Sequence, residues 1–168
     1  MKQSSIILSL AFFLFLNFPA IAQWNSPVTP DATGTTGLNT SMAIVSGTPA
    51  IAYRNNSSNE LRYVRANDAT GTSWGTPIIV DNTRTPHTPS LNMVNGVPAI
   101  AYSNYYNKDL MFVRALNSTG TSWDTPITVD AAGKVGRYAS LQIVNGFPAI
   151  AYFDWTNWDI KYVRASHA

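Results

Sequence analysis

Hydrophobic and polar residues alternate along short stretches of this 168-residue chain, and turn-forming residues separate the stretches. Residues 90–94 alternate and end at Asn95-Gly96, a dipeptide that favours a type I′ hairpin turn because both of its residues accept a positive φ. Residues 97–103 are then predicted to form the returning strand. Two further runs, at 110–115 and 125–129, predict a third and a fourth strand.

This unit of about fifty residues occurs three times. The segment Pro98-Ala99-Ile100-Ala101-Tyr102 of the middle copy is repeated without change at 49–53 and 148–152. Val113-Arg114-Ala115 returns at 64–66 and 163–165. Self-similarity at such a period is typical of solenoids, arrays and β-propellers.

Four short antiparallel strands per repeat, apolar on both faces, predict an all-β fold of β-propeller blades. Both faces are apolar because each blade packs between two neighbours. A solenoid of parallel strands is the alternative, and the Asn-Gly hairpins argue against it because parallel strands need long crossovers. The expected architecture is therefore a partial propeller or half of a six-bladed ring.

The first 22 residues have the pattern of a secretory signal peptide. Lys2 precedes an apolar run at 6–18, and Ala20-Ile21-Ala22 is a cleavage pattern. We expect residues 1–22 to be a signal peptide and residues 23–168 to be a three-blade repeat domain. The run is too short to span a bilayer, so we expect no membrane attachment after cleavage, with a retained anchor as the alternative. The absence of cysteine from an exported chain favours a secreted or periplasmic bacterial protein.

The position within the repeat at which the expected mature chain starts has a consequence for assembly. Residues 24–31 match residues 74–81 and 123–130, so the expected mature chain starts on a fourth-strand segment. We expect the Trp24 strand to complete a last blade, either in a homodimer that closes a six-bladed propeller or by folding back within one chain. Outer blade faces would then expose Leu141 and Ile143, or their counterparts, in a monomer.

The loop after the third strand carries a motif in two repeats. It is Asp68-Ala69-Thr70-Gly71-Thr72-Ser73-Trp74 in the first copy and Asn117-Ser118-Thr119-Gly120-Thr121-Ser122-Trp123 in the second. The motif resembles the Asp-box, S/T-x-D-x-G-x-T-W, of sialidase-like propellers, with one additional residue before the glycine and Asn117 in place of the acid. The whole chain resembles bacterial BNR or sialidase-like P-A-I-A-Y…Y-V-R-A repeat proteins. This resemblance implies a propeller fold, in which Trp74 and Trp123 are structural, and specifies no activity.

The chemistry expected of a sialidase is only partly represented. That family uses three converging arginines, a Tyr–Glu nucleophile pair and an acidic proton donor, yet Glu60 is the only glutamate in the chain. Arg65, Arg114 and Arg164 recur at one repeat position, which favours a structural role with Asp81 and Asp130 as candidate acceptors. An enzymatic activity is therefore uncertain and less favoured than binding, and we assign no catalytic residue.

The residues that break the repeat are the candidates for a ligand site. In a propeller, the loops between second and third strands share one face with the loops that connect blades. The candidate ligand-binding residues there are Arg84, His87, Tyr105, Tyr106, Arg137, Tyr138, Trp155 and Trp158. Aromatic rings beside amides and charges suit sugars, because rings stack on C–H patches while polar groups bond hydroxyls. The alternative is that Trp155 and Trp158 only pack the loop or a blade seam.

These observations favour a secreted, non-catalytic binding module that recognises a glycan or a surface protein through loop aromatics. The alternative is a sialidase-like glycoside hydrolase, its inactive remnant, or a fragment of a longer propeller. We expect no cofactor and no metal, because two histidines and no cysteine offer few ligands. The basic residues are scattered, so no nucleic-acid partner is expected.

Overall fold

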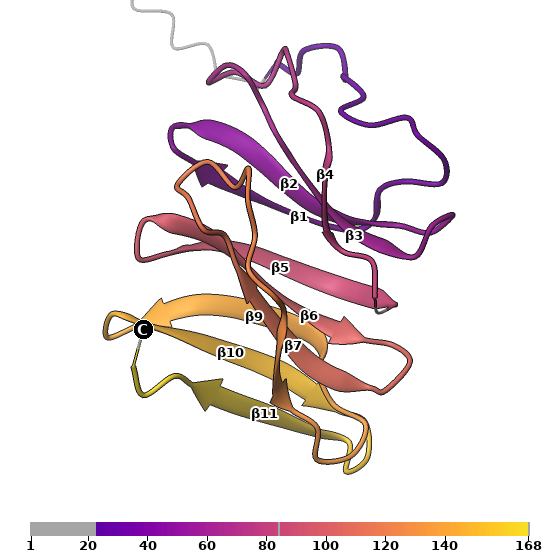
Figure 1. Cartoon of the computed structure of the whole chain (residues 1–168), viewed down its shortest axis with the longest axis vertical. Helices are drawn as coiled ribbons and strands as arrows, with labels where there is room; N and C mark the ends of the chain where they lie inside the picture. The colour runs from indigo at the N-terminus through magenta and orange to yellow at the C-terminus, as the bar shows by residue number, and fades with distance from the viewer. Residues whose placement is uncertain (1–22, 84, 168) are drawn as a thin grey trace, which may run out of the picture.

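The computed structural model describes residues 23–83 and 85–167. All regular elements in this part of the chain are β-strands, arranged in three antiparallel sheets (Figure 1). The first sheet contains β1 (Leu38–Val45), β2 (Thr48–Asn55), β3 (Glu60–Arg65) and β4 (Ile78–Asp81). The second contains β5 (Pro86–Val94), β6 (Val97–Asn104), β7 (Asp109–Arg114) and β8 (Ile127–Asp130). The third contains β9 (Arg137–Val144), β10 (Phe147–Asp154) and β11 (Asp159–Arg164).

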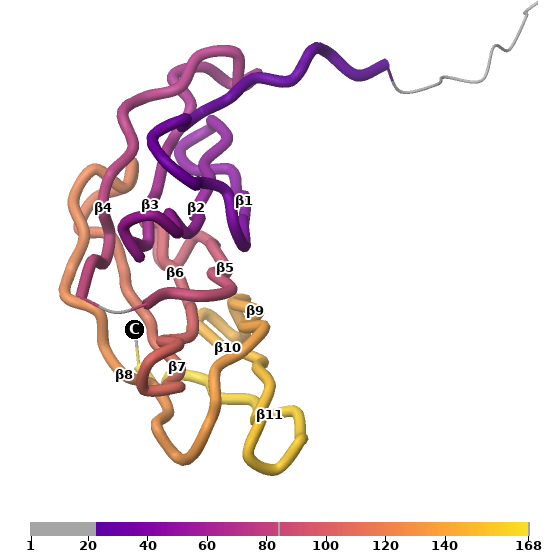
Figure 2. Tube along the Cα trace, turned by 90° about the vertical axis from the view of Figure 1, so that its right-hand side faces the viewer, coloured from indigo at the N-terminus to yellow at the C-terminus, as the bar shows by residue number. Residues whose placement is uncertain are grey.

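The strands of each sheet are adjacent in chain order, so each repeat forms its own sheet. The sheets also stack in chain order, with the first at one end of the molecule and the third at the other (Figure 1). Strands β1, β5 and β9 follow one side of the stack, and β4 and β8 follow the opposite side (Figure 2). The all-β prediction is confirmed, and the antiparallel pairing removes the parallel-solenoid alternative.

The hairpin between the first two strands of each sheet has the predicted turn. Asn95 and Gly96 have φ values of 49° and 79°, and Asn145 and Gly146 have 49° and 79°. Two successive positive φ values define a type I′ turn, whose twist matches that of the flanking strands. This prediction is confirmed, and the turn fixes the register in which β5 pairs with β6.

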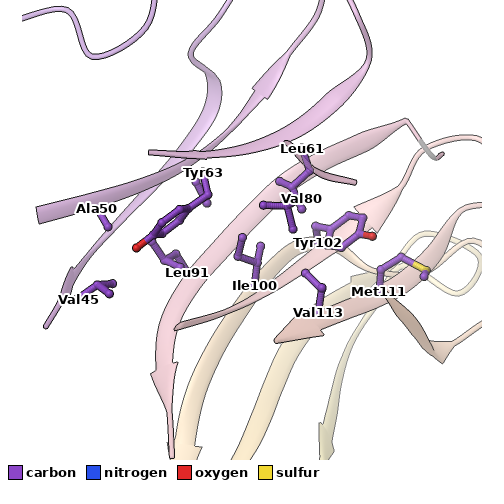
Figure 3. Close-up of a cluster of buried hydrophobic side chains, with 11 residues drawn as sticks. Val45, Ala50, Leu61, Tyr63, Val80, Leu91, Ile100, Tyr102, Met111 and Val113 are labelled. Atoms are coloured by element: carbon purple, nitrogen blue, oxygen red, sulfur yellow. The ribbon is translucent and has the colours of Figure 1, made fainter. Parts of the chain in front are cut away.

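Two apolar cores lie between the sheets. The core between the first and second sheets is shown in Figure 3, where Tyr63 of β3 lies beside Leu91 of β5. Leu61, Ile100 and Met111 in this core are completely buried. The members of this core are Val45, Ala50, Ala52, Leu61, Tyr63, Val80, Leu91, Ile100, Tyr102, Met111 and Val113. Alternate residues of the middle sheet therefore face opposite neighbours, which explains why both faces of that repeat are apolar.

Leu141 corrects one prediction about exposed residues. It is 1% exposed, because β9 turns it toward the second sheet, where it joins the core that contains Leu110 and Ile150. Its counterpart in the first sheet, Met42, faces away from the second sheet and is 66% exposed. Ile143 is 39% exposed, as expected. The open apolar surface thus lies on the first sheet at these repeat positions.

A repeated hydrogen bond links the aspartate at the end of each fourth strand to a tyrosine of the following repeat. The Tyr102 hydroxyl of β6 donates to Asp81 Oδ2 of β4 at 2.5 Å, and the Tyr152 hydroxyl of β10 donates to Asp130 Oδ2 of β8 at 2.6 Å. Both bonds cross from one sheet to the next. This polar contact replaces the arginine partnership that the sequence predicts for Asp81 and Asp130.

Arg65, the first of the repeated arginines, instead donates to backbone carbonyls. Arg65 Nε donates to the Val45 carbonyl at 3.0 Å, and Nη2 donates to the Ser46 carbonyl at 3.2 Å. Arg65 ends β3 beside the β1–β2 turn, so its guanidinium reaches the turn and not the aspartates. For Arg65 the predicted structural role is confirmed, and the predicted aspartate acceptors are wrong. The equivalent Nε of Arg114 is buried without a hydrogen-bond acceptor among the described residues.

The Asp-box-like loops are closed by their own side chains. The Asp68 carboxylate accepts bonds from the Thr72 and Ser73 amides at 3.1 and 2.8 Å, and hydrogen bonding lowers its pKa. Trp74 Nε1 donates to the Gly71 carbonyl at 2.8 Å. Asn117 replaces the acid and accepts from the Thr121 amide at 3.0 Å.

Trp123 repeats the indole bond of Trp74 by donating to the Gly120 carbonyl at 2.8 Å. Its ring also packs edge-on against Tyr63 of the first sheet, with ring centroids 5.2 Å apart. Both tryptophans are half-buried and hold the entrance to a fourth strand, as the bridges Ala66–Trp74 and Ala115–Trp123 show. Their structural role is confirmed.

The N-terminal segment differs from its matching segments. Residues 23–30 form no strand, and Trp24 is 90% exposed. Asp31 lies against the first sheet, where it accepts from the Tyr53 hydroxyl at 2.6 Å and from Arg62 Nη1 at 3.0 Å. The segment and β11 lie at opposite ends of the stack (Figure 1). The predicted fold-back of the Trp24 strand onto residues 163–165 does not occur within this chain.

Candidate functional site

The predicted ligand-binding loops lie at one end of the sheets. Asn56, Tyr105 and Trp155 start equivalent β2–β3, β6–β7 and β10–β11 loops. Their amides donate to the carbonyls of Thr35, Thr85 and Lys134, each at 2.8 Å. Each of these acceptors lies in the segment before the first strand of its own sheet. We call this end of the molecule the loop face.

Local turn chemistry sets the direction of the loop side chains. Asn104 Oδ1 accepts from the Tyr106 amide at 3.0 Å, and Asp154 Oδ1 accepts from the Thr156 amide at 2.9 Å. Each loop ends on a residue with positive φ, which is 64° at Lys108 and 62° at Trp158. The backbone turns sharply there, and the Trp158 side chain remains 73% exposed.

Arg137, at the start of β9, lies between two aromatic rings. Its guanidinium carbon is 3.7 Å from the Trp155 ring centroid and 5.6 Å from that of Tyr105. The Tyr105 ring stacks on His87 at 4.7 Å, with the planes 27° apart, and Lys108 Nζ lies 4.5 Å from the Tyr105 centroid. We call His87, Tyr105, Lys108, Arg137 and Trp155 the aromatic–cation cluster. Cation–π attraction and ring stacking hold it together.

A chain of rings extends the cluster across the third sheet. The Trp158 ring meets Trp155 at 6.4 Å and Phe153 at 5.8 Å, both with steep angles between ring planes. Phe153 in turn lies 6.4 Å from Tyr138. Tyr138 is 69% exposed, so Trp158 and Tyr138 present open ring faces beside the buried parts of the cluster. Six of the predicted site residues are therefore connected through contacts.

The remaining two candidates are placed differently. Tyr106 is 85% exposed and borders a separate polar cavity of about 450 Å³ with Thr83 and Asn107. Arg84 lies outside the described residues. Phe153 and Lys108 are not among the predicted site residues, although Phe153 stands where the other repeats have Arg54 and Ser103 and so also breaks the repeat.

A buried arginine adds positive charge beneath the loop face. Arg54 is 8% exposed, and its Nη2 donates to Asn59 Oδ1 at 2.7 Å while Nη1 contacts His87 Nε2. Within residues 23–83 and 85–167, no carboxylate lies within ion-pair distance of Arg54, and its Nε has no hydrogen-bond acceptor. Burial lowers the pKa of Arg54.

The same environment keeps His87 neutral. Burial, together with the charges of Arg54 and Arg137, lowers the pKa of His87 to about 4. A neutral imidazole can accept from Arg54 at Nε2, which a protonated ring could not do. The positive charge of the cluster near neutral pH is therefore carried by arginine and lysine.

This pKa difference predicts a pH-dependent stability. Unfolded His87 gains a proton below about pH 6.5, whereas folded His87 does so only near pH 4, so its contribution to stability falls between these values. As the pH is lowered from 7 to 4, we expect the wild type to lose more of its free energy of unfolding than His87→Gln does. Urea unfolding at several pH values measures this. His167→Gln, at an exposed site, should retain the wild-type profile, and equal slopes for all three proteins would contradict the assignment.

The carboxylates of Asp154 and Glu60, near the loop face, already accept hydrogen bonds from neighbouring side chains. Asp154 is buried, and its Oδ2 accepts from Asn157 Nδ2 at 2.9 Å within the same turn. Glu60 Oε2 accepts from Arg62 Nε at 2.7 Å. No group of three or more His, Asp or Glu side chains in the described part of the chain could hold a metal ion. The arrangement thus offers ring faces and positive charge, which are the means of binding an anionic or polyhydroxylated ligand.

The cluster is packed at its base and open at its surface. The cavity among Tyr105, Lys108, Arg137 and Trp155 measures only about 10 Å³, so a ligand would lie on the surface and not in a deep pocket. Trp155 is half-buried against Arg137, whereas Trp158 is exposed. Trp155 and Trp158, which the sequence predicts to share one role, therefore occupy different environments.

Comparison with known proteins adds no family assignment: no protein-family model matches this chain, and no curated protein does. Among the described residues, no helix is long and apolar enough to cross a membrane.

Proposed function

We propose that the three sheets are blades of a β-propeller. Each is an antiparallel unit of consecutive strands that packs face to face on the next, and the first strands of all three follow one side of the stack (Figure 2). Radial repetition of such sheets is the architecture of propellers. The Asp-box-like loops and their hydrogen-bonded tryptophans support the resemblance to sialidase-like repeats.

We propose that the loop face binds an acidic carbohydrate and that the chain acts without catalysis. The observation that carries this proposal is Arg137, which lies between Tyr105 and Trp155 beside the exposed ring of Trp158. An exposed indole can stack on the C–H face of a sugar ring. Arg137 and Lys108 can bind a carboxylate or sulfate group on the same sugar. The charge of buried Arg54 increases the positive potential at this face.

A sialidase-like hydrolase has less support. Glycosidases need a pair of carboxyl groups across the scissile bond. Tyr53 and Asp31 resemble a Tyr–acid nucleophile pair, but the same bond recurs as Tyr102–Asp81 and Tyr152–Asp130, so the repeat architecture accounts for it.

We also propose that residues 1–22 direct export and are removed, which would place the domain in the periplasm or outside a bacterial cell. The apolar run and the Ala20-Ile21-Ala22 pattern support this proposal. An extracellular location would bring the loop face into contact with cell-surface or environmental glycans.

A glycan array probed with the full-length chain tests the binding proposal. We expect acidic oligosaccharides to bind and their signal to fall in 1 M salt, because salt screens exposed charges. Trp158→Ala should weaken binding about fivefold or more, since a stacked ring contributes about 1 kcal/mol or more. Arg137→Gln should weaken acidic ligands more than neutral ones.

Leu116→Ala is the control, because Leu116 is 64% exposed in the β7–β8 loop at the opposite end of the sheets. If Leu116→Ala and Trp158→Ala weaken binding equally, the ligand does not bind at the loop face. Binding to proteins but to no glycan would favour recognition of a surface protein, and cleavage of a sialoside that is lost in Glu60→Gln would favour the hydrolase.

A further inference from the structure

An apolar cavity of about 470 Å³ opens between the second and third sheets. Phe112 and Val129 of the second sheet line it on one side, and Ile150 and Val163 of the third sheet on the other. Ala165 lies at its edge, beside the end of β11. No segment within the described residues pairs with the free edge of β11.

The equivalent place between the first and second sheets is filled. There, Tyr63 holds the repeat position of Phe112, and the Trp123 ring packs on it at 5.2 Å. The Tyr63 hydroxyl also donates to the Thr119 carbonyl of the same β7–β8 loop at 3.1 Å. The cavity beside Phe112 is thus equivalent to the place that Trp123, at the entrance to β8, fills between the first and second sheets.

A segment with the required sequence is exposed at the other end of the molecule. Residues 24–31, W-N-S-P-V-T-P-D, match residues 123–130, W-D-T-P-I-T-V-D, at tryptophan, proline, threonine and aspartate positions. Trp24 is 90% exposed and Val28 is 50% exposed, so neither has a place in the core of its own chain.

Asp31 occupies, relative to the first sheet, the same position that Asp130 of β8 occupies relative to the third sheet. It accepts from Tyr53 and Arg62, as Asp130 of β8 accepts from Tyr152 at 2.6 Å and Lys161 at 2.5 Å. Asp130 makes these bonds while its strand belongs to the preceding sheet. By the same geometry, residues 24–31 are placed to join a sheet that precedes the first one.

We propose that two copies of this chain assemble head to tail, with residues 24–31 of each copy forming the fourth strand of the other's third sheet. The register follows from the pairs Ala115–Trp123 and Phe112–Ile127 in the second sheet. Ala165 would accordingly face Trp24 of the second copy, and Tyr162 would face its Val28. Trp24 then fills the cavity beside Phe112.

The sheet faces at the two ends of the stack suit the same assembly. Ile160 and Tyr162 of the third sheet are 83% and 60% exposed, although Leu61 and Tyr63, at the same repeat positions, are 0% and 1% exposed beneath the second sheet. Met42 and Ile44 of the first sheet are 66% and 59% exposed. Stacking the first sheet of one copy on the third sheet of the other buries both apolar surfaces, which is the usual reason for such patches.

The number of copies follows from the number of sheets. Propellers typically have four to eight blades, and with three sheets in the described part of each copy only two copies give a total in that range. Two identical head-to-tail contacts then close a ring with two-fold symmetry, and the free edge of each β11 gains a paired strand. Glycan binding is not required for this contact, so the two proposals can be tested separately.

Disulfide cross-linking tests the register directly, because the chain has no cysteine of its own. A full-length Val28→Cys variant mixed with a Tyr162→Cys variant should give a covalent dimer on mild oxidation, since facing Cα atoms about 5 Å apart suit a disulfide. Val28→Cys mixed with Tyr106→Cys is the control, because Tyr106 lies on the loop face and should give no dimer.

Light scattering of the full-length chain measures the assembly itself. We expect twice the monomer mass, and Trp24→Ala should raise the dimer dissociation constant at least about tenfold, as loss of a buried aromatic anchor does. Because Trp24 is exposed in its own chain, Trp24→Ala should leave the fold of each copy unchanged, which circular dichroism verifies. Leu116→Ala should dimerise as the wild type does. A monomer, an open polymer, or a dimer without the Val28–Tyr162 cross-link would overturn the proposal.

Discussion

The substitution Gly136→Ala is expected to destabilise the chain by about 3 to 5 kcal/mol, which corresponds to a decrease in Tm of about 10 °C or more. Gly136 precedes β9 with φ of 87°, where a side chain is strained. A Cβ atom there would lie 2.7 Å from Leu110 Cα and 2.9 Å from the Asp109 carbonyl oxygen. These are backbone atoms of β7, so the second and third sheets would have to move apart. Thermal unfolding measures the loss.

Gly37→Ala provides a matched control. Gly37 precedes β1 at the same place in the first repeat and has φ of 82°, but a Cβ atom there meets nothing within 4 Å. We expect a cost of only about 1 to 2 kcal/mol from backbone strain. Equal losses for the two variants would show that the close approach of Gly136 to β7 contributes nothing.

The substitution Asp81→Ala is expected to cost about 3 kcal/mol. Asp81 is 4% exposed and accepts from the completely buried Tyr102 hydroxyl at 2.5 Å, so the alanine leaves a buried phenol without this acceptor. Asp81 also accepts from the Thr83 amide at 2.9 Å, and that bond is lost as well. Urea unfolding of the variant measures the effect.

A double-mutant cycle separates the Asp81–Tyr102 bond from the other contacts of Asp81. Tyr102→Phe combined with Asp81→Ala should cost less than the sum of the single changes, with a coupling energy of about 1 to 3 kcal/mol. Asp124→Ala, in an exposed loop, should change stability by no more than about 0.5 kcal/mol. Strict additivity of the two changes would contradict a coupled link between the sheets.

Local patterns predicted the sheets well because their causes are local. The Asn95-Gly96 turn requires two positive φ values, and alternation of apolar residues follows directly from strand geometry. The half-buried positions of Trp74 and Trp123 also follow from the loop motif. Element ends moved by a few residues, as for β5, which starts at Pro86 although its predicted run starts at Ser90.

Predictions that depended on a neighbouring strand or on a particular hydrogen-bond acceptor were less successful. Residues 24–31 have the sequence of a fourth strand, but a strand needs a neighbour for its backbone bonds, and no such neighbour lies beside them. Arg65 was predicted to meet an aspartate, yet the nearer acceptors are carbonyls of the adjacent turn. The repeat pattern shows which residues are equivalent. It does not show which hydrogen-bond acceptor lies nearest to an arginine in the folded chain.

The candidate site was predicted as a set of residues but not as a geometry. Departure from the repeat identified His87, Tyr105, Arg137, Trp155 and Trp158, and the structure brings these side chains together. The sequence did not indicate that Arg54 contacts His87 or that Arg137 lies between two rings. The Arg54–His87 and Arg137–Tyr105 contacts join different sheets, and their distances depend on how the sheets stack.

Because every sheet consists of consecutive residues, the stack behaves as a row of units that interact only with their neighbours. Stability in such a row is the sum of terms for single units and for the boundaries between them. In a monomer, amide hydrogen exchange should therefore divide the chain into blocks, with the middle sheet protected longest because it alone has two boundaries. An open row can fray from either terminal sheet, whereas a closed ring has no terminal sheet, so ring closure would convert gradual fraying into a single cooperative transition.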